Sequence, residues 1–274
     1  MTDGLDGVRD HYGATGLTER LRTALAALGS EDQILAPRQL AALDQFHTRG
    51  LAATAELAEL AGITAEMSVL DVGSGVGGPA RFLAATYGCR VTGVDLSEPF
   101  VDAARYLTER TGQGGRVSFE TGSALELPLD DGRFDAVLLQ HVAMNIADRA
   151  RLYREIRRVL KSGGRFATFD VVLKGGEPHY PVPWARTPAT SFLLTEAATR
   201  EAIEPAGFRA LAWQDDTEAA KVWFAQLRES GPPPPPNLGT VMGPDVAELA
   251  GNLGRNLMEG RLGILTALFE AAPI

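Results

Sequence analysis

The stretch Ser68-Val-Leu-Asp-Val-Gly-Ser-Gly-Val-Gly-Gly78 joins a short apolar segment to a turn rich in glycine. The segment 68–72 has the length and the Val and Leu content of a buried strand. Pro79 follows directly, and proline suits the first turn of a helix because its missing N–H is not needed there. Strand, glycine turn and helix in this order predict the start of an α/β domain.

Strands and helices alternate along the rest of the chain. Further apolar runs predict strands at 90–94, 116–120, 134–139, 165–172, 208–214 and 263–269. The helix that Asp148 caps is expected to run up to Gly163 and Gly164. Such alternation implies right-handed crossovers and helices on both faces of the sheet. We therefore predict an α/β fold with a doubly wound, mostly parallel seven-stranded sheet.

Residues 1–66 are expected to form a helical cap ahead of this sheet. Leucines repeat with helical spacing over 21–28, and the stretch 48–61 is rich in alanine and leucine. The prolines at 232–236 form a stiff spacer, but the residues after them are too few for an independent core. We therefore predict the cap at 1–66 and one α/β domain at 67–274.

The composition excludes several classes of protein. The 274 residues are 45% hydrophobic and 22% charged, and a formal net charge of −9 disfavours broad binding to nucleic-acid phosphates. No apolar stretch reaches the ~20 residues of a membrane helix, and the acidic segment 1–10 does not resemble a secretory signal. A single cysteine, Cys89, excludes an intrachain disulfide. We expect a cytoplasmic protein with neither a nucleic-acid partner nor a membrane, and we find no metal-ligand cluster.

The glycine turn indicates the kind of ligand. Gly73, Gly75 and Gly78 fit the G-x-G-x-x-G fingerprint of dinucleotide sites, which is weak on its own. Asp95 ends the next strand, where an acid can accept hydrogen bonds from both hydroxyls of a ribose. Asp71 stands two positions before the turn, and its carboxylate would repel a pyrophosphate but attract a cation. The charges therefore favour a nucleoside cofactor that carries a cationic group.

Five stretches together carry a family resemblance: Ser68 to Gly78, Val91-Thr-Gly-Val-Asp-Leu-Ser97, Gly122-Ser-Ala-Leu-Glu-Leu-Pro128, Phe134-Asp-Ala-Val-Leu-Leu-Gln-His141 and Arg158-Val-Leu-Lys-Ser-Gly-Gly164. In this order they resemble the motifs of class I S-adenosylmethionine-dependent methyltransferases. The segment Asp44-Gln-Phe-His-Thr-Arg-Gly50 resembles the one ahead of the domain in sarcosine/dimethylglycine and phosphoethanolamine N-methyltransferases. The resemblance implies a Rossmann-like methyltransferase fold, S-adenosyl-L-methionine as cofactor, S-adenosyl-L-homocysteine as product and a small-molecule methyl acceptor.

The resemblance also assigns contacts to the cofactor. Asp95 would bind the ribose, and Leu96 would pack on the adenine. Ser123 stands where the family usually has an acid for the adenine amino group, and an arginine at position 49 suits the cofactor carboxylate. Together with Asp71, the cofactor set is Thr48, Arg49, Asp71, Gly73, Gly75, Gly77, Asp95, Leu96, Ser123, Ala124 and Gln140.

The acceptor side is less determined by the sequence. Methyl transfer is an in-line displacement, so a base is needed only when the acceptor loses a proton. His141, which follows the fourth strand, and Tyr12 are the candidate catalytic residues, and each could instead be structural. The loop 174–190 is aromatic and stiffened by proline, and it is expected to cover the acceptor. The candidate acceptor contacts are His47, Asn145, Tyr180 and Trp184.

The leading hypothesis is methyl transfer to an amine nitrogen, or to an oxygen or carbon of a specialised metabolite. A nicotinamide-dependent oxidoreductase is an alternative, although Asp71 opposes it and the sequence has no Tyr-x-x-x-Lys pair. A catalytically silent module that only binds the cofactor is another. Methylation of nucleic acid is disfavoured because Gln140 to Asn145 stand where an Asn-Pro-Pro-Tyr type of motif would be. The sequence leaves the oligomeric state open.

Overall fold

The computed structural model describes residues 16–26, 33–231 and 233–272. The strands are β1 Ser68–Val72, β2 Arg90–Asp95, β3 Val117–Thr121, β4 Phe134–Gln140, β5 Leu160–Leu173, β6 Phe208–Asp215 and β7 Leu262–Ala271. The α-helices are α2 Leu17–Leu25, α3 Ala41–Asp44, α4 Gly50–Ala61, α5 Gly78–Tyr87, α6 Glu98–Arg110, α7 Arg149–Val159, α8 Glu196–Ile203, α9 Thr217–Ser230, α10 Leu238–Met242 and α11 Val246–Met258. Short 3-10 helices are η2 Pro37–Leu40, η3 Ala143–Asn145, η4 Pro188–Thr190 and η5 Glu204–Ala206. Within these described ranges, no helix combines the length and the apolar character that crossing a membrane requires.

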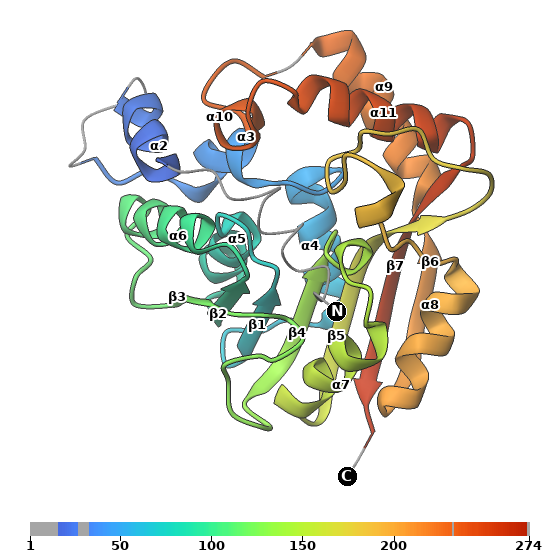
Figure 1. The fold of residues 1–274 in the computed structure, drawn as a ribbon. Coiled ribbons are helices and arrows are strands. Elements are labelled where there is room, and N and C mark those ends of the chain that lie inside the picture. Colours follow the sequence, from blue (N-terminus) through green and yellow to red (C-terminus); the bar gives the residue numbers. More distant parts are fainter. Residues whose placement is uncertain (1–15, 27–32, 232, 273–274) are drawn as a thin grey trace.

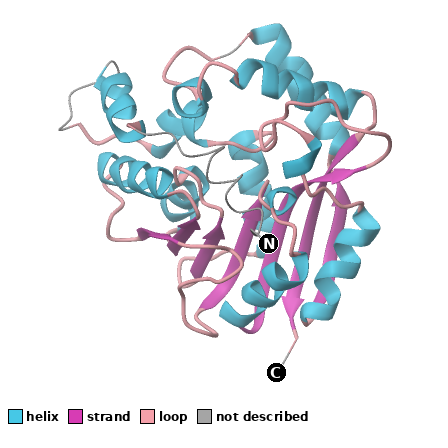
Figure 2. Cartoon of the chain, in the orientation of Figure 1, coloured by secondary structure: helices cyan, strands magenta, loops and turns pink. Residues whose placement is uncertain are grey.

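The strands form one sheet in the order β3-β2-β1-β4-β5-β7-β6 (Figures 1 and 2). Strand β7 runs antiparallel to both of its neighbours, and the remaining pairs are parallel. The predicted doubly wound, mostly parallel seven-stranded sheet is confirmed. The direction of winding reverses between β1 and β4, and sheets of this kind bind ligands at that switch point, beyond the carboxyl ends of the strands.

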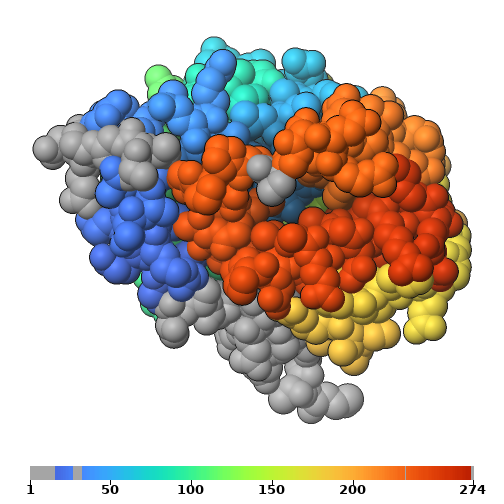
Figure 3. Space-filling view, turned by 90° about the horizontal axis from the view of Figure 1, so that it is seen from above, coloured from blue at the N-terminus to red at the C-terminus, as the bar shows by residue number. Residues whose placement is uncertain are grey.

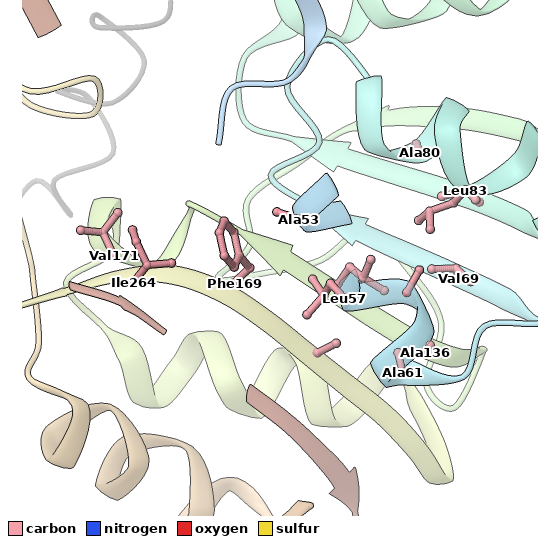
Figure 4. Close-up of a cluster of buried hydrophobic side chains, with 14 of the residues drawn as sticks. Ala53, Leu57, Ala61, Val69, Ala80, Leu83, Ala136, Phe169, Val171 and Ile264 are labelled. Carbon is pink, nitrogen blue, oxygen red and sulfur yellow. The ribbon is translucent and has the colours of Figure 1, made fainter. Parts of the chain in front are cut away.

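Buried apolar clusters hold helices against both faces of the sheet. On one face, α4 contributes Ala53, Leu57 and Ala61, whose spacing of four residues places them on one side of the helix. They join Val69 of β1 and Phe169 of β5 in a single cluster (Figure 4). The opposite face is covered by α7 and α8. Helix α4 is thereby fixed over the centre of the sheet, with its N-terminal end close to the switch point.

Further helices lie beyond the carboxyl ends of the strands. Figure 1 shows α3, α9, α10 and α11 above the sheet, with α2 beside them. Leu21 of α2, Leu107 of α6 and Val241 of α10 share a buried cluster, so chain segments far apart in sequence pack together here. Figure 3 looks down on this cover and shows a hollow between α9, α10 and α11. The division of the chain into 1–66 and 67–274 stays a prediction.

One predicted boundary is wrong. Helix α7 ends at Val159, and β5 begins at once with Leu160, whereas the sequence pattern predicts a helix that runs up to Gly163. Leu160 adopts extended backbone angles and pairs with Phe134, and a bulge after this pair takes up the extra residues. The helix is shorter than predicted because Leu160 gains a strand partner.

Candidate active site

A cavity opens at the switch point, beyond the carboxyl ends of β1, β2 and β4. It encloses about 980 Å³, including its open mouth. Its walls come from the glycine turn, the ends of β2 and β4, the loop after β3 and two segments of the cover. The sequence-predicted residues that line it are Gly73, Gly75, Asp95, Leu96, Ser123, Ala124, Gln140, His141, Asn145 and Trp184.

The glycine turn and Asp95 are fixed to each other. Gly73 has a φ of 73°, and a Cβ there would lie 2.4 Å from Val142 Cγ2, so this position accepts no side chain. The N–H of Gly75 donates to Asp95 Oδ2 at 2.8 Å, and the N–H of Ser97 donates to Asp95 Oδ1 at 2.9 Å. These bonds leave further lone pairs of the carboxylate for a ligand, as hydrogen bonding to two ribose hydroxyls requires.

Asp71 lies beneath the glycine turn and outside the cavity wall. Its side chain is buried, and Oδ2 has no hydrogen-bond partner among the described residues. Burial, together with the neighbouring Asp95 carboxylate, raises the pKa of Asp71 to about 7. A cation bound above the turn would favour the ionised form, so Asp71 is suited to respond to a positively charged ligand.

Gln140 ends β4 beside the first glycine of the turn, because Val72 pairs with Leu139 in the register of β1 and β4. Its Nε2 donates to Thr54 Oγ1 at 3.3 Å, and its buried Oε1 has no partner in the described part of the chain. Asn145 Oδ1 is unpartnered in the same way. Buried acceptor oxygens are normally hydrogen-bonded, so this wall suits a ligand that brings N–H donors.

His141 stands at the mouth of β4 with a φ of 54°, in the left-handed region. The backbone N–H of His141 donates to the backbone carbonyl of Phe169 at 2.8 Å, and the imidazole ring stacks on the Phe169 ring. Its Nε2 lies 3.4 Å from Thr48 Oγ1. Burial, with a smaller contribution from His47, holds the pKa of His141 well below its usual range, so the imidazole is neutral at pH 7. A neutral imidazole has one ring nitrogen free to accept a proton, although burial disfavours the charged form that results.

His47 and Arg49 lie outside the cavity wall. Nε2 of His47 is 3.0 Å from the Gly50 carbonyl oxygen and 3.0 Å from Thr54 Oγ1, and burial lowers the pKa of His47 to about 4. Arg49 has a left-handed φ of 63° and forms an ion pair with Glu56. It lines a separate hollow beside α4, so the structure does not bring its guanidinium to the glycine turn.

Three further candidates among the described residues, Thr48, Gly77 and Tyr180, are also not part of the wall. Gly77 is the residue before α5, with a φ of 81°, and a Cβ there would lie 2.4 Å from the ring of Phe119. Tyr180 packs against the cluster on the α4 face. Tyr12 lies outside the described residues. Their proposed roles stay predictions.

The remainder of the wall is largely apolar. Trp184 reaches it from the loop 174–190, and its indole N–H donates to Ser191 Oγ at 2.9 Å, which fixes the ring. Sequence reasoning missed Met242, which comes from the short helix α10, and Phe46, although Phe46 lies inside the segment 44–50 that carried part of the resemblance. The lining residues not predicted are Phe46, Val94, Phe100, Gly122, Leu125, Val142, Met144, Ile146, Pro183 and Met242.

Few charges reach the cavity. In the described part of the chain, Asp95 is the one charged side chain of the wall, and neither lysine nor arginine lines it. The same residues contain no group of three or more His, Cys, Asp or Glu arranged to hold a metal ion. The donor set therefore fits an organic ligand with a ribose-like diol and a positive charge.

Comparison with known proteins identifies the domain. A family model described as "Methyltransferase domain" matches residues 70–168, which include the glycine turn, Asp95 and Gln140. The chain contains a methyltransferase domain. The resemblance stated from the sequence is confirmed over these residues, and a solved structure of the same fold, geranyl diphosphate methyltransferase, contains the cofactor that the resemblance implied, S-adenosyl-L-methionine. The buried acceptors around the turn of this methyltransferase domain fit the ammonium and sulfonium of that cofactor.

Two curated relatives show how far the similarity extends. Methyltransferase GfsG of Streptomyces halstedii is 37% identical over 133 residues, which are 48% of this chain and 48% of that protein. Sarcosine/dimethylglycine N-methyltransferase of Halorhodospira halochloris is 31% identical over 161 residues, 58% of each chain. The chain therefore spans about half the length of the curated relatives it matches.

A solved structure adds a further neighbour. The crystal structure of the [4+2]-cyclase SpnF superposes with a TM-score of 0.66 at 26% sequence identity, over 81% of this chain and 81% of that chain. The similarity of the methyltransferase domain thus reaches a protein named for a different reaction.

Proposed function

We propose that this chain transfers a methyl group from S-adenosylmethionine to a neutral, largely apolar small molecule. A nitrogen, oxygen or carbon of the acceptor forms the new bond to the methyl carbon, in line with the carbon–sulfur bond that breaks. The electron pair of the broken bond stays on sulfur, and S-adenosylhomocysteine leaves. The contribution of the protein is to align the partners and exclude water, with His141 available to take a proton where the acceptor releases one.

One observation supports the choice of cofactor above the others. Asp71 Oδ2 and Gln140 Oε1 are buried acceptors next to the glycine turn, and neither has a partner in the described ranges. The ammonium and sulfonium of S-adenosylmethionine complement them. A nicotinamide dinucleotide would place a pyrophosphate near Asp71, and the two negative charges would repel each other.

The wall opposite the turn supports the acceptor class. Met144, Ile146, Pro183, Trp184 and Met242 are apolar, and the described wall offers no lysine or arginine to pair with a carboxylate or a phosphate. Burying an unpaired anionic acceptor against these apolar side chains would cost several kcal/mol, whereas the carboxylate of the cofactor brings the countercharge of its own ammonium. We therefore propose an acceptor without a carboxylate or phosphate, held through apolar and aromatic contacts.

The test has two stages. Calorimetric titrations of the full chain with S-adenosylhomocysteine and with NAD determine which nucleoside binds. The chain is then incubated with methyl-labelled S-adenosylmethionine and a metabolite extract, and mass spectrometry detects labelled products. We expect binding of S-adenosylhomocysteine, no binding of NAD, and label in neutral, apolar products.

Matched variants sharpen both stages. Asp95→Ala removes the carboxylate from the cavity, whereas Asp130→Asn alters an exposed aspartate of a surface turn. We expect Asp95→Ala to give no labelled product and Asp130→Asn to give the same labelled products as the wild-type chain. Binding of NAD alone would support the oxidoreductase, and binding without any labelled product would support the silent module. Label confined to anionic products would overturn the acceptor class.

A further inference from the structure

A fully buried ion pair lies behind the glycine turn. Nη2 of Arg81 on α5 donates to Asp44 Oδ2 at 2.9 Å, and the two side chains are 0% and 2% exposed. Guanidinium groups only donate hydrogen bonds. Asp44 therefore accepts this hydrogen bond. The pair is the first link in a chain of hydrogen bonds that continues through Gln45 and Thr54 to Gln140 in the cavity wall.

The next two groups take their orientation from this pair. Gln45 Nε2 donates to Asp44 Oδ1 at 3.1 Å, which turns Oε1 of the same amide toward Thr54. The hydroxyl of Thr54 donates to that Oε1 at 3.5 Å. Because a threonine hydroxyl has one hydrogen, Thr54 can only accept from its other neighbours.

His47 leads to the same orientation independently. Its Nε2 faces the Gly50 carbonyl oxygen at 3.0 Å, and a carbonyl only accepts, so this nitrogen carries the ring hydrogen. The same N–H faces Thr54 Oγ1 at 3.0 Å. Thr54 thus accepts from His47 as well, and its own hydrogen is left for Gln45.

The amide of Gln140 is the last group of this chain. Because Thr54 Oγ1 can only accept here, the amide atom of Gln140 that lies 3.3 Å from it must be a donor. That atom is Nε2. Its Oε1 is then turned away from Thr54, and it is buried and unpartnered within the described residues. Gln140 itself lines the cavity and follows Leu139, which pairs with Val72 just before the glycine turn. The orientation of the Gln140 amide is therefore determined at the far end of this chain of hydrogen bonds. There, the guanidinium of Arg81 can only donate a hydrogen bond.

We propose that Thr54 is a positioning residue that holds the Gln140 amide with its oxygen toward the cavity, where it accepts a hydrogen bond from the ammonium of the cofactor. This inference rests on the proposed function. Arg81, Asp44 and Gln45 set the orientation of Thr54, and none of them lines the cavity. The proposal assigns to a helix outside the matched domain, α4, a part in recognising the amino group of the nucleoside.

The test compares two ligands on the full chain by calorimetry. One is S-adenosylhomocysteine, and the other is its analogue with hydrogen in place of the amino group. Thr54→Val keeps the shape of the side chain but removes its hydrogen bonds. We expect this variant to bind S-adenosylhomocysteine about tenfold more weakly, which is the effect of losing one hydrogen bond to a charged group. Affinity for the deaminated analogue should stay within about twofold of wild type, and Thr54→Ser should restore the difference between the ligands.

The outcomes separate this inference from the proposed function. Equal weakening of both ligands by Thr54→Val would mean that Thr54 only supports the packing of α4, and the positioning role would be overturned. Unchanged affinity for both ligands would overturn it as well. Failure of the wild-type chain to bind S-adenosylhomocysteine would instead contradict the proposed function, whatever the variant does.

Discussion

The imidazole of His141 lies parallel to the ring of Phe169, with centroids 5.2 Å apart and an angle of 12° between the planes. This contact holds the imidazole in the cavity wall although its backbone is in the left-handed region. Phe169 belongs to the cluster under α4, so the position of His141 depends on the core and not on the loop that follows it.

We expect His141→Ala to lower turnover by roughly 100-fold or more if the acceptor loses a proton, since general bases contribute about that factor. Affinity for S-adenosylhomocysteine should remain within about twofold, because the ribose and amino-acid contacts are elsewhere. Steady-state rates and calorimetry measure the two effects. His179→Ala is the control, because His179 lies outside the cavity, with its Nε2 2.7 Å from Glu259 Oε2. Wild-type turnover in His141→Ala would remove this residue from the mechanism.

Cofactor affinity should depend on pH through Asp71. Its pKa is about 7 in the free protein, and a bound cation favours the carboxylate, so binding below pH 7 has to release a proton. Affinity for S-adenosylhomocysteine should therefore fall as the pH drops from 8 to 6, by up to about tenfold per unit below 7. Calorimetry at several pH values measures this, and Asp71→Asn should bind weakly with a flat profile. A flat profile for the wild-type chain would contradict the pairing.

Asp95→Ala should weaken the binding of S-adenosylhomocysteine by at least about 100-fold, because the two hydrogen bonds to the charged group contribute about 1.5–3 kcal/mol each. The same substitution also removes the acceptor of the Gly75 N–H, so the turn loses one of its supports. Measuring 2′-deoxy and ribose forms of the ligand separates the two effects. The wild-type chain should prefer the ribose form, and the variant should not distinguish them.

Arg81→Met should destabilise the protein by about 3–5 kcal/mol, because it leaves the Asp44 carboxylate buried without its partner. Urea unfolding followed by circular dichroism measures the free energy of unfolding. Arg151→Met is the matched control, since its partner Glu126 is exposed, and it should cost less than about 1 kcal/mol. The double variant with Asp44→Leu should lose less stability than Arg81→Met alone. A larger loss in the double variant would argue against an unpaired charge as the cause.

Much of the fold could be predicted because its signals are local. Strand β1 is a mostly apolar run that leads directly into a turn rich in glycine, and the order of such units implies a parallel sheet. The end of α7 was not predictable, since Leu160 is equally suited to helix and strand until Phe134 lies beside it. Helix α10 was missed because a helix of one turn carries no periodic pattern.

The candidate site divides in the same way. Asp95 and Gln140 lie at the ends of strands, so the topology alone brings them together. Arg49 has the residue type that suits a carboxylate, but its left-handed backbone and Glu56 hold it elsewhere. Met242 reaches the cavity only through the packing of α10, which depends on long-range contacts that no local pattern encodes.

The floor of the cavity is built between β1 and β4, whereas Trp184 and Met242 arrive from segments that follow β5. Exchanging these later segments between homologous proteins would leave nucleoside recognition in place and change which molecules are admitted. The residues proposed to bind the nucleoside and those proposed to select the acceptor thus come from different parts of the chain. Acceptor selectivity could therefore change through the segments after β5 while the β1–β4 part stays the same.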